Sequence, residues 1–193
     1  MAKEDAIEMF VGGLVLDPAT QAPILLLKSE KGDVCLPIWI GIAEATSIAT
    51  VLKNISLARP MTHDLMYQTL LKVGLGVQRV LVSDLRDGTY YAELVLGQGD
   101  RAVILDARPS DAIAIALRAS APIFVSKVVL ERARVAMENA SSAGEESKVE
   151  EQEGVEEDVI NKGVCEKDFN SIDREKWSKI LAELDPDDFK YKM

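Results

Sequence analysis

The chain has 193 residues, of which 22 are Lys or Arg and 32 are Asp or Glu, so its formal net charge is −10. A composition of 48% hydrophobic and 28% charged residues is that of a globular protein with a buried core, not of a fibrous or wholly disordered one. No apolar run reaches the roughly 18 residues that a membrane span needs, and we expect no signal peptide. Two cysteines and one histidine exclude a disulfide framework and a His-rich metal site, and they favour a cytoplasmic location.

The negative charge is concentrated toward the C-terminus. Residues 1–138 hold 14 Lys or Arg and 16 Asp or Glu, a net charge of −2, whereas residues 139–193 hold 8 and 16, a net charge of −8. We therefore expect a folded domain over 1–138, an acidic disordered linker over 139–165 and a short helical tail over 166–193. An apolar stripe in that tail, which includes Trp177, either docks on the domain or binds a partner protein.

The domain consists of two similar halves, each with three strands and a helix. Hydrophobic periodicity and turn residues predict the first half at 7–16, 24–28, 34–40 and 44–55, and the second half at 78–85, 89–96, 102–106 and 108–119. The remaining elements are a helix at 62–73, a strand at 123–125 and a helix at 126–137. The helix between the halves should turn three apolar residues inward: Met66, Leu70 and Val73. The expected class is α+β, with a largely antiparallel sheet built from two strand-strand-strand-helix units and further helices packed on it.

A first polar cluster precedes the helix at 62–73. Thr62 is expected to cap this helix, which places Asp64 in the first turn, where the helix dipole favours a carboxylate. Capping explains these two residues but not His63 or Arg59. A lone histidine at the start of a helix is more often structural than catalytic, so both interpretations of His63 stay open.

A second cluster lies where the strand at 78–85 ends. Alternation along a strand places Asp84 and Arg86 on the same face, and Asp87 precedes a glycine in a tight hairpin turn. A surface ion pair accounts for the first two residues and the turn accounts for the third, so this cluster alone does not indicate a reaction.

The third cluster is the densest, with Asp106, Arg108, Ser110 and Asp111 within six residues. It lies between an apolar strand and an apolar helix, both expected to be buried, which would hold the junction rigidly. Carboxylates beside an arginine suit phosphodiester chemistry, because the carboxylates can hold Mg²⁺ or Mn²⁺ while the arginine pairs with phosphate. A route without metal would use His63 as the base. Ion pairing and helix capping are the structural alternative, and capping also accounts for Glu44.

The chain resembles the bifunctional nuclease domain family in five motifs, which occur in order at residues 36–41, 59–65, 84–91, 106–112 and 121–123. The resemblance spans about residues 5–135, and it implies an α+β domain whose family members have both RNase and DNase activity. The candidate site residues that it implies are the polar members of the matching motifs: His63, Asp64, Asp84, Arg86, Asp87, Asp106, Arg108, Ser110 and Asp111.

Three functions are compatible with these observations. The first is a nuclease that hydrolyses RNA and DNA with little sequence preference. The second is a non-catalytic binding or regulatory module that oligomerises and recruits a partner protein through the C-terminal helix. The third is a sensor of a phosphate or nucleotide ligand. A homo-oligomer is expected because Trp39, Met61, Tyr90 and Phe124 exceed what a modest sheet needs to cover.

Overall fold

The computed structural model of the chain describes residues 5–18, 20–99 and 101–143. In chain order their elements are β1 (Ala6–Leu16), β2 (Pro23–Ser29), β3 (Cys35–Trp39), α1 (Ile42–Leu52), α2 (Thr62–Lys72), β4 (Gly76–Arg86), β5 (Thr89–Gln98), β6 (Arg101–Ala107), α3 (Pro109–Ala119), β7 (Ile123–Ser126) and α4 (Lys127–Ala143). Each element predicted within these ranges is present, with bounds that differ by a few residues.

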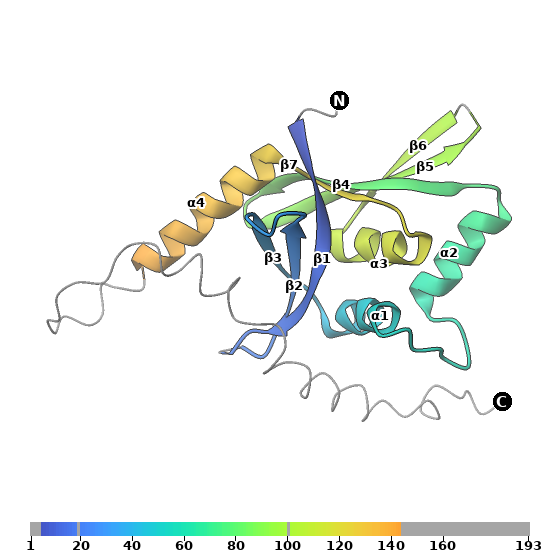
Figure 1. Cartoon of the computed structure of the whole chain (residues 1–193), viewed down its shortest axis with the longest axis horizontal. Helices are drawn as coiled ribbons and strands as arrows, with labels where there is room; N and C mark the ends of the chain where they lie inside the picture. Colours follow the sequence, from blue (N-terminus) through green and yellow to red (C-terminus); the bar gives the residue numbers. More distant parts are fainter. Residues whose placement is uncertain (1–4, 19, 100, 144–193) are drawn as a thin grey trace, which may run out of the picture.

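All seven strands form one sheet in the order β3-β2-β1-β7-β4-β5-β6. Neighbouring strands are antiparallel except β4 and β7, which run parallel. The short strand β7 therefore joins two three-stranded meanders, β1–β3 and β4–β6, which are followed in the chain by α1 and α3 (Figure 1). The α+β class and the two strand-strand-strand-helix units are confirmed.

The turn between β4 and β5 shows how local sequence sets this topology. Asp87 and Gly88 have φ angles of 48° and 74°. Positive φ at both central residues is the requirement of a two-residue type I′ turn, which matches the twist of the strands that it connects. The predicted hairpin is confirmed.

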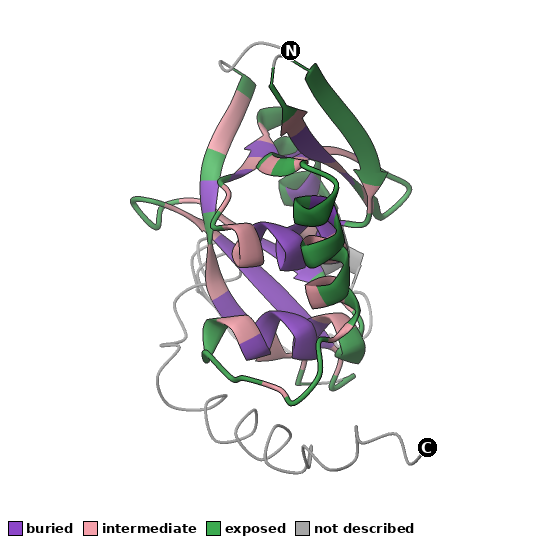
Figure 2. Cartoon of the chain, turned by 90° about the vertical axis from the view of Figure 1, so that its right-hand side faces the viewer, coloured by how far each residue is buried: buried purple, intermediate pink, exposed green. Residues whose placement is uncertain are grey.

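Helices α1 and α3 pack on one side of the sheet, α2 packs on α3, and α4 lies on the other side of the sheet (Figures 1 and 2). The central helix is α3, which packs against α1, α2, β4 and β5. Five consecutive residues of α3, Ala112–Ala116, are buried, and both Ile113 of α3 and Ile48 of α1 are fully buried in the core. Alternating alanines keep α3 slim enough for close packing on two neighbours. This packing fixes the N-terminal ends of α1, α2 and α3 relative to one another.

The outer face of α2 differs from the prediction. Only Leu70 is buried, whereas Met66 is 40% and Val73 55% exposed, because α3 covers only one narrow face of α2. The helix also begins differently: Met61 is the N-cap and Thr62 the first helical residue. The Asp64 carboxylate accepts a hydrogen bond from the Met61 backbone N–H at 2.9 Å, so Asp64 does part of the capping expected of Thr62.

The strand β6 was expected to be buried, and this prediction is wrong. Val103, Ile104 and Leu105 are 41%, 59% and 36% exposed. The physical reason is the topology: β6 is an edge strand that pairs only with β5, and the sheet ends there. An apolar edge without a proline is a surface on which chains associate. Self-association stays a prediction.

The C-terminal predictions fall largely outside the described residues. Helix α4 runs to Ala143, so residues 139–143, expected to begin the linker, are helical. The rest of the predicted linker, and the predicted tail with its partner protein, lie beyond the described part of the chain. None of the helices in the described ranges is both long and apolar enough to cross a membrane.

The cytoplasmic location stays a prediction, because nothing in the described residues places the protein in a particular compartment.

Candidate active site

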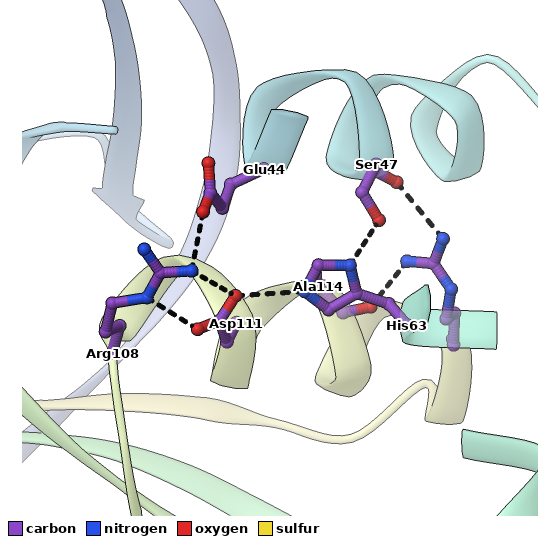
Figure 3. Close-up of polar contacts among 7 residues, drawn as sticks. Glu44, Ser47, His63, Arg108, Asp111 and Ala114 are labelled. Atoms are coloured by element: carbon purple, nitrogen blue, oxygen red, sulfur yellow. Dashed lines mark hydrogen bonds and ion pairs between the residues drawn. The ribbon is translucent and has the colours of Figure 1, made fainter. Parts of the chain in front are cut away.

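A chain of hydrogen bonds links the three helices at the N-terminal end of α3 (Figure 3). Ser47 is in α1, His63 is the second residue of α2, and Asp111 is in the first turn of α3. The Ser47 Oγ lies 2.9 Å from His63 Nδ1, and His63 Nε2 lies 3.0 Å from Asp111 Oδ1. The imidazole ring of His63 thus contacts two residues that are distant in the sequence, one 16 positions before it and one 48 positions after it.

Arg108 extends this chain toward the surface. As the N-cap of α3 it donates from Nε to Asp111 Oδ2 at 2.7 Å and from Nη2 to Asp111 Oδ1 at 3.1 Å. Its Nη2 also donates to Glu44 Oε1 at 2.5 Å. These bonds hold the guanidinium plane fixed between two carboxylates from α1 and α3. The Nη1 group has no partner among the described residues, so both of its N–H bonds can meet a ligand.

The protonation states follow from these contacts. Burial raises the pKa of Asp111, but hydrogen bonds from Arg108 and His63 lower it by a larger amount, so the pKa lies below its usual value. An ionised carboxylate can only accept, so His63 Nε2 carries the proton that it shares with Asp111. The Ser47 hydroxyl can either donate to Nδ1 or accept from it.

Exposure rises along the chain of contacts. Ser47 is 1% exposed, whereas the side chains of His63, Asp111 and Arg108 are 14%, 30% and 66% exposed. A substrate in solution would meet Arg108 and Asp111 first. The Ser47–His63–Asp111 order resembles the triad of a serine hydrolase, but a hydroxyl this deeply buried cannot serve as the nucleophile. Ser47 instead orients the imidazole.

A second, buried arginine fastens the same helices below the site. The side chain of Arg118, only 6% exposed, donates from Nε to Asp64 Oδ1 at 2.6 Å. It also donates to the carbonyl oxygen of Ala114 at 2.9 Å and to that of Ser47 at 3.3 Å. Asp64 and Ser47 are the chain neighbour and the hydrogen-bond partner of His63, so Arg118 helps to fix the position of that ring.

The structure divides the candidate residues into groups. His63, Arg108 and Asp111 meet, and Asp64 supports them through Arg118. Ser110 is buried beside them without a side-chain hydrogen bond among the described residues. The others lie elsewhere, and no hydrogen bond or ion pair of the described residues joins them to His63: Asp84 and Arg86 pair with each other, Asp87 is in the β4–β5 turn, and Asp106 is an exposed residue of β6 opposite Glu93.

Sequence reasoning missed three members of the two arginine-centred networks. Glu44 was attributed to helix capping, but it binds Arg108 instead. Ser47 lies one turn after Glu44 on the same face of α1, a spacing that could have indicated a shared function. Arg118 closes an otherwise apolar helix, and a cation at that end is ordinarily explained by the helix dipole.

The lowered pKa values of Asp64 and Asp111 predict how stability depends on pH. Burial raises the pKa of Asp64, yet hydrogen bonds from Arg118 and Met61 lower it overall, as Arg108 and His63 do for Asp111. A depressed pKa contributes stability above the unfolded value of 3.8 that is lost as pH falls through the folded value.

We therefore expect the free energy of unfolding to fall from about pH 5 downward, and to fall less steeply in Asp111→Asn. Urea denaturation at several pH values measures both slopes. Asp87→Asn is the matched control, because Asn tolerates the positive φ of this exposed turn and should keep the wild-type slope. Equal slopes in wild type and Asp111→Asn would contradict the assignment.

Fold and site together define an α+β domain with a hydrogen-bonded Ser-His-Asp-Arg chain that joins α1 to the first turns of α2 and α3. A model of the bifunctional nuclease domain family matches residues 25–138. The chain belongs to this family.

Curated relatives fall into two groups. An uncharacterized protein of Mycobacterium tuberculosis is 36% identical over 183 residues, which is 95% of this chain and 98% of that protein. Bifunctional nuclease 1 of Arabidopsis thaliana is 34% identical over 120 residues, and bifunctional nuclease 1 of Oryza sativa subsp. japonica is 30% identical over 114 residues. The matched parts are 60% and 58% of this chain but only 37% and 34% of the two plant proteins.

Proposed function

We propose that this site hydrolyses phosphodiester bonds in RNA and DNA with little sequence preference. One observation carries the proposal: the exposed Arg108 is held beside the Asp111 carboxylate, which is also hydrogen-bonded to His63. Two N–H bonds of Arg108 remain for a ligand. Membership of the family and the names of its plant relatives support this activity. A contact from an arginine to a backbone phosphate carries no base information, which accords with low sequence preference.

Arg108 supplies the substrate contact. Hydrogen bonds to Asp111 and Glu44 raise its pKa, so the guanidinium is charged at any physiological pH. Donation from Nη1 to a non-bridging phosphate oxygen would neutralise charge that grows in the transition state. Because Arg108 is already held in place, little reorganisation is needed when the substrate binds.

Asp111 supplies the base. Its carboxylate is the acceptor exposed beside Arg108, so it accepts the proton of the attacking water as the new P–O bond forms and the bond to the leaving oxygen breaks. The leaving oxygen takes a proton from solvent. His63, bonded to Asp111 through Nε2, stabilises the carboxylate and holds its orientation. A base with a lowered pKa is weak, so we expect a slow enzyme.

The site residues do not fit a divalent cation well. No three His, Cys, Asp or Glu side chains within the described ranges cluster closely enough to hold a metal ion. The two carboxylates nearest to the proposed reaction, Glu44 and Asp111, both already bind Arg108. No step of the mechanism is therefore assigned to Mg²⁺ or Mn²⁺.

Competition between substrates tests the proposal. If one site cleaves both polymers, an unlabelled RNA should inhibit cleavage of labelled single-stranded DNA with an inhibition constant equal to the KM of that RNA. EDTA should change the rate by no more than about twofold, because Arg108 neutralises the phosphate through charge-assisted hydrogen bonds and no metal ion is needed for this. Purified protein that cleaves neither polymer would overturn the proposal. Cleavage that EDTA abolishes and Mn²⁺ restores would overturn the metal-free mechanism.

A further inference from the structure

A second arginine cluster, built on Asp84, lies where β4 ends. Both carboxylate oxygens of Asp84 are used: Oδ2 accepts from Arg86 Nε and Oδ1 from Arg132 Nη1, each at 2.5 Å. Arg132 Nη1 also donates to the Leu85 carbonyl oxygen at 3.1 Å. Arg132 is in α4, 48 residues from Asp84 in the sequence, so the cluster is a product of the fold.

Within this cluster the cations lie outside and the carboxylate inside. The side chain of Asp84 is 20% exposed, whereas those of Arg86 and Arg132 are 64% and 52% exposed. Two guanidinium groups share one carboxylate, so the cluster keeps a net charge of +1. A hydrogen bond from Arg86 lowers the pKa of Asp84, which therefore stays ionised and keeps both arginines in place.

Hydrogen-bond donors remain after these contacts. Arg86 uses only Nε, so the four N–H bonds of its two Nη groups have no partner among the described residues. Arg132 uses only Nη1, which leaves Nε and Nη2. Donors of two fixed, exposed guanidinium groups that face solvent are suited to phosphate oxygens, which accept several hydrogen bonds at once.

An aromatic ring completes the surface. The guanidinium carbon of Arg86 lies 5.1 Å from the centroid of the Tyr91 ring, a cation–π contact that further fixes Arg86. Tyr91 is 37% exposed. Unpaired bases stack on aromatic rings and on guanidinium planes, whereas bases inside a duplex are not accessible for such stacking.

We propose that Asp84, Arg86, Tyr91 and Arg132 form a binding subsite for the backbone of single-stranded nucleic acid, separate from the His63–Asp111 centre. The inference rests on the proposed function for its ligand class. It also gives the motif at 84–91 a different function, since Arg86 and Asp84 then hold the substrate strand and do not take part in bond cleavage.

Binding without turnover tests this subsite. The probe is a fluorescein-labelled oligouridylate titrated with the full chain carrying Asp111→Asn, and anisotropy gives Kd at several salt concentrations. Adding Arg86→Ala and Arg132→Ala should weaken binding at least tenfold at low salt. The slope of log Kd against log salt should fall by about 1.4, the share of two phosphate contacts on a single strand. Because only binding is read, the result is independent of whether the wild-type chain cleaves.

Two further variants separate the subsite from general charge and from fold. Arg134→Ala removes the same charge from the same helix at a side chain 58% exposed, and it should leave affinity within twofold. Replacing both Arg86 and Arg132 with lysine keeps the charge and should restore most of the salt slope. Equal weakening by Arg134→Ala, or unchanged affinity in the double alanine variant with an unchanged thermal transition, would overturn the proposal.

Discussion

Replacing Asp111 with asparagine should lower the rate of RNA cleavage by about 10²–10⁴-fold, the usual contribution of a general base. Asparagine keeps the size of the side chain and can still accept from Arg108, but its amide cannot take a proton from the attacking water. KM should change little, because the Nη1 group that would meet the phosphate stays in place. Single-turnover cleavage of a labelled RNA measures the chemical step separately from product release.

His63 provides the matched comparison for this prediction. In His63→Gln an amide can still donate toward Asp111, whereas His63→Ala leaves Asp111 with Arg108 as its sole side-chain donor among the described residues. If His63 acts by orienting Asp111, the glutamine variant should recover part of the rate that the alanine variant loses. Equal rates for the two variants would show that the hydrogen bond to Asp111 does not matter.

Replacing Arg118 with methionine should reduce the free energy of unfolding by about 2–4 kcal/mol. Breaking a fully buried pair costs more, but Asp64 is 31% exposed and water can partly replace its lost partner. The Ser47 and Ala114 carbonyl oxygens lose a donor at the same time. Urea denaturation with tryptophan fluorescence measures the loss.

Two variants bracket this stability prediction. Arg118→Lys keeps the charge without the planar fork, so its loss should be intermediate. Arg134→Met removes an exposed arginine whose Glu131 pair spans 3.6 Å, and should change stability by less than about 0.5 kcal/mol. Wild-type stability in Arg118→Met would mean that α1, α2 and α3 are held together by apolar packing alone.

Much of the fold could be predicted because local signals and the global arrangement agree. Asp87 and Gly88 specify their turn, and Pro109 occupies the first position of α3, where the missing N–H costs nothing. The burial of β6 could not be predicted in the same way. An apolar run such as Val103–Leu105 has the same sequence pattern in a central strand as in an edge strand. Only the order of the strands in the sheet determines whether it is buried.

The site was predictable in its residue types but not in its grouping. The dense run from Asp106 to Asp111 contains Arg108 and Asp111, and the structure brings His63, a candidate from another cluster, into contact with Asp111. Asp106 shares that run, yet strand alternation and the edge position carry it away from the imidazole. The contact of Ser47 with His63 could not be predicted, because nothing in the sequence around a serine within a helix indicates which distant residue it contacts.

The central claim is that Asp111, held by His63 and Arg108, is the base of a phosphodiesterase. The most direct measurement is the initial rate of cleavage of one labelled RNA by wild type and by Asp111→Asn, purified in parallel and assayed across the same gel-filtration peak. We expect activity to follow the wild-type protein peak and to be at least 100-fold lower in the variant, while the two thermal transitions agree. Equal activity in both preparations would contradict the claim, because the cleavage would then come from a contaminating enzyme or from another site.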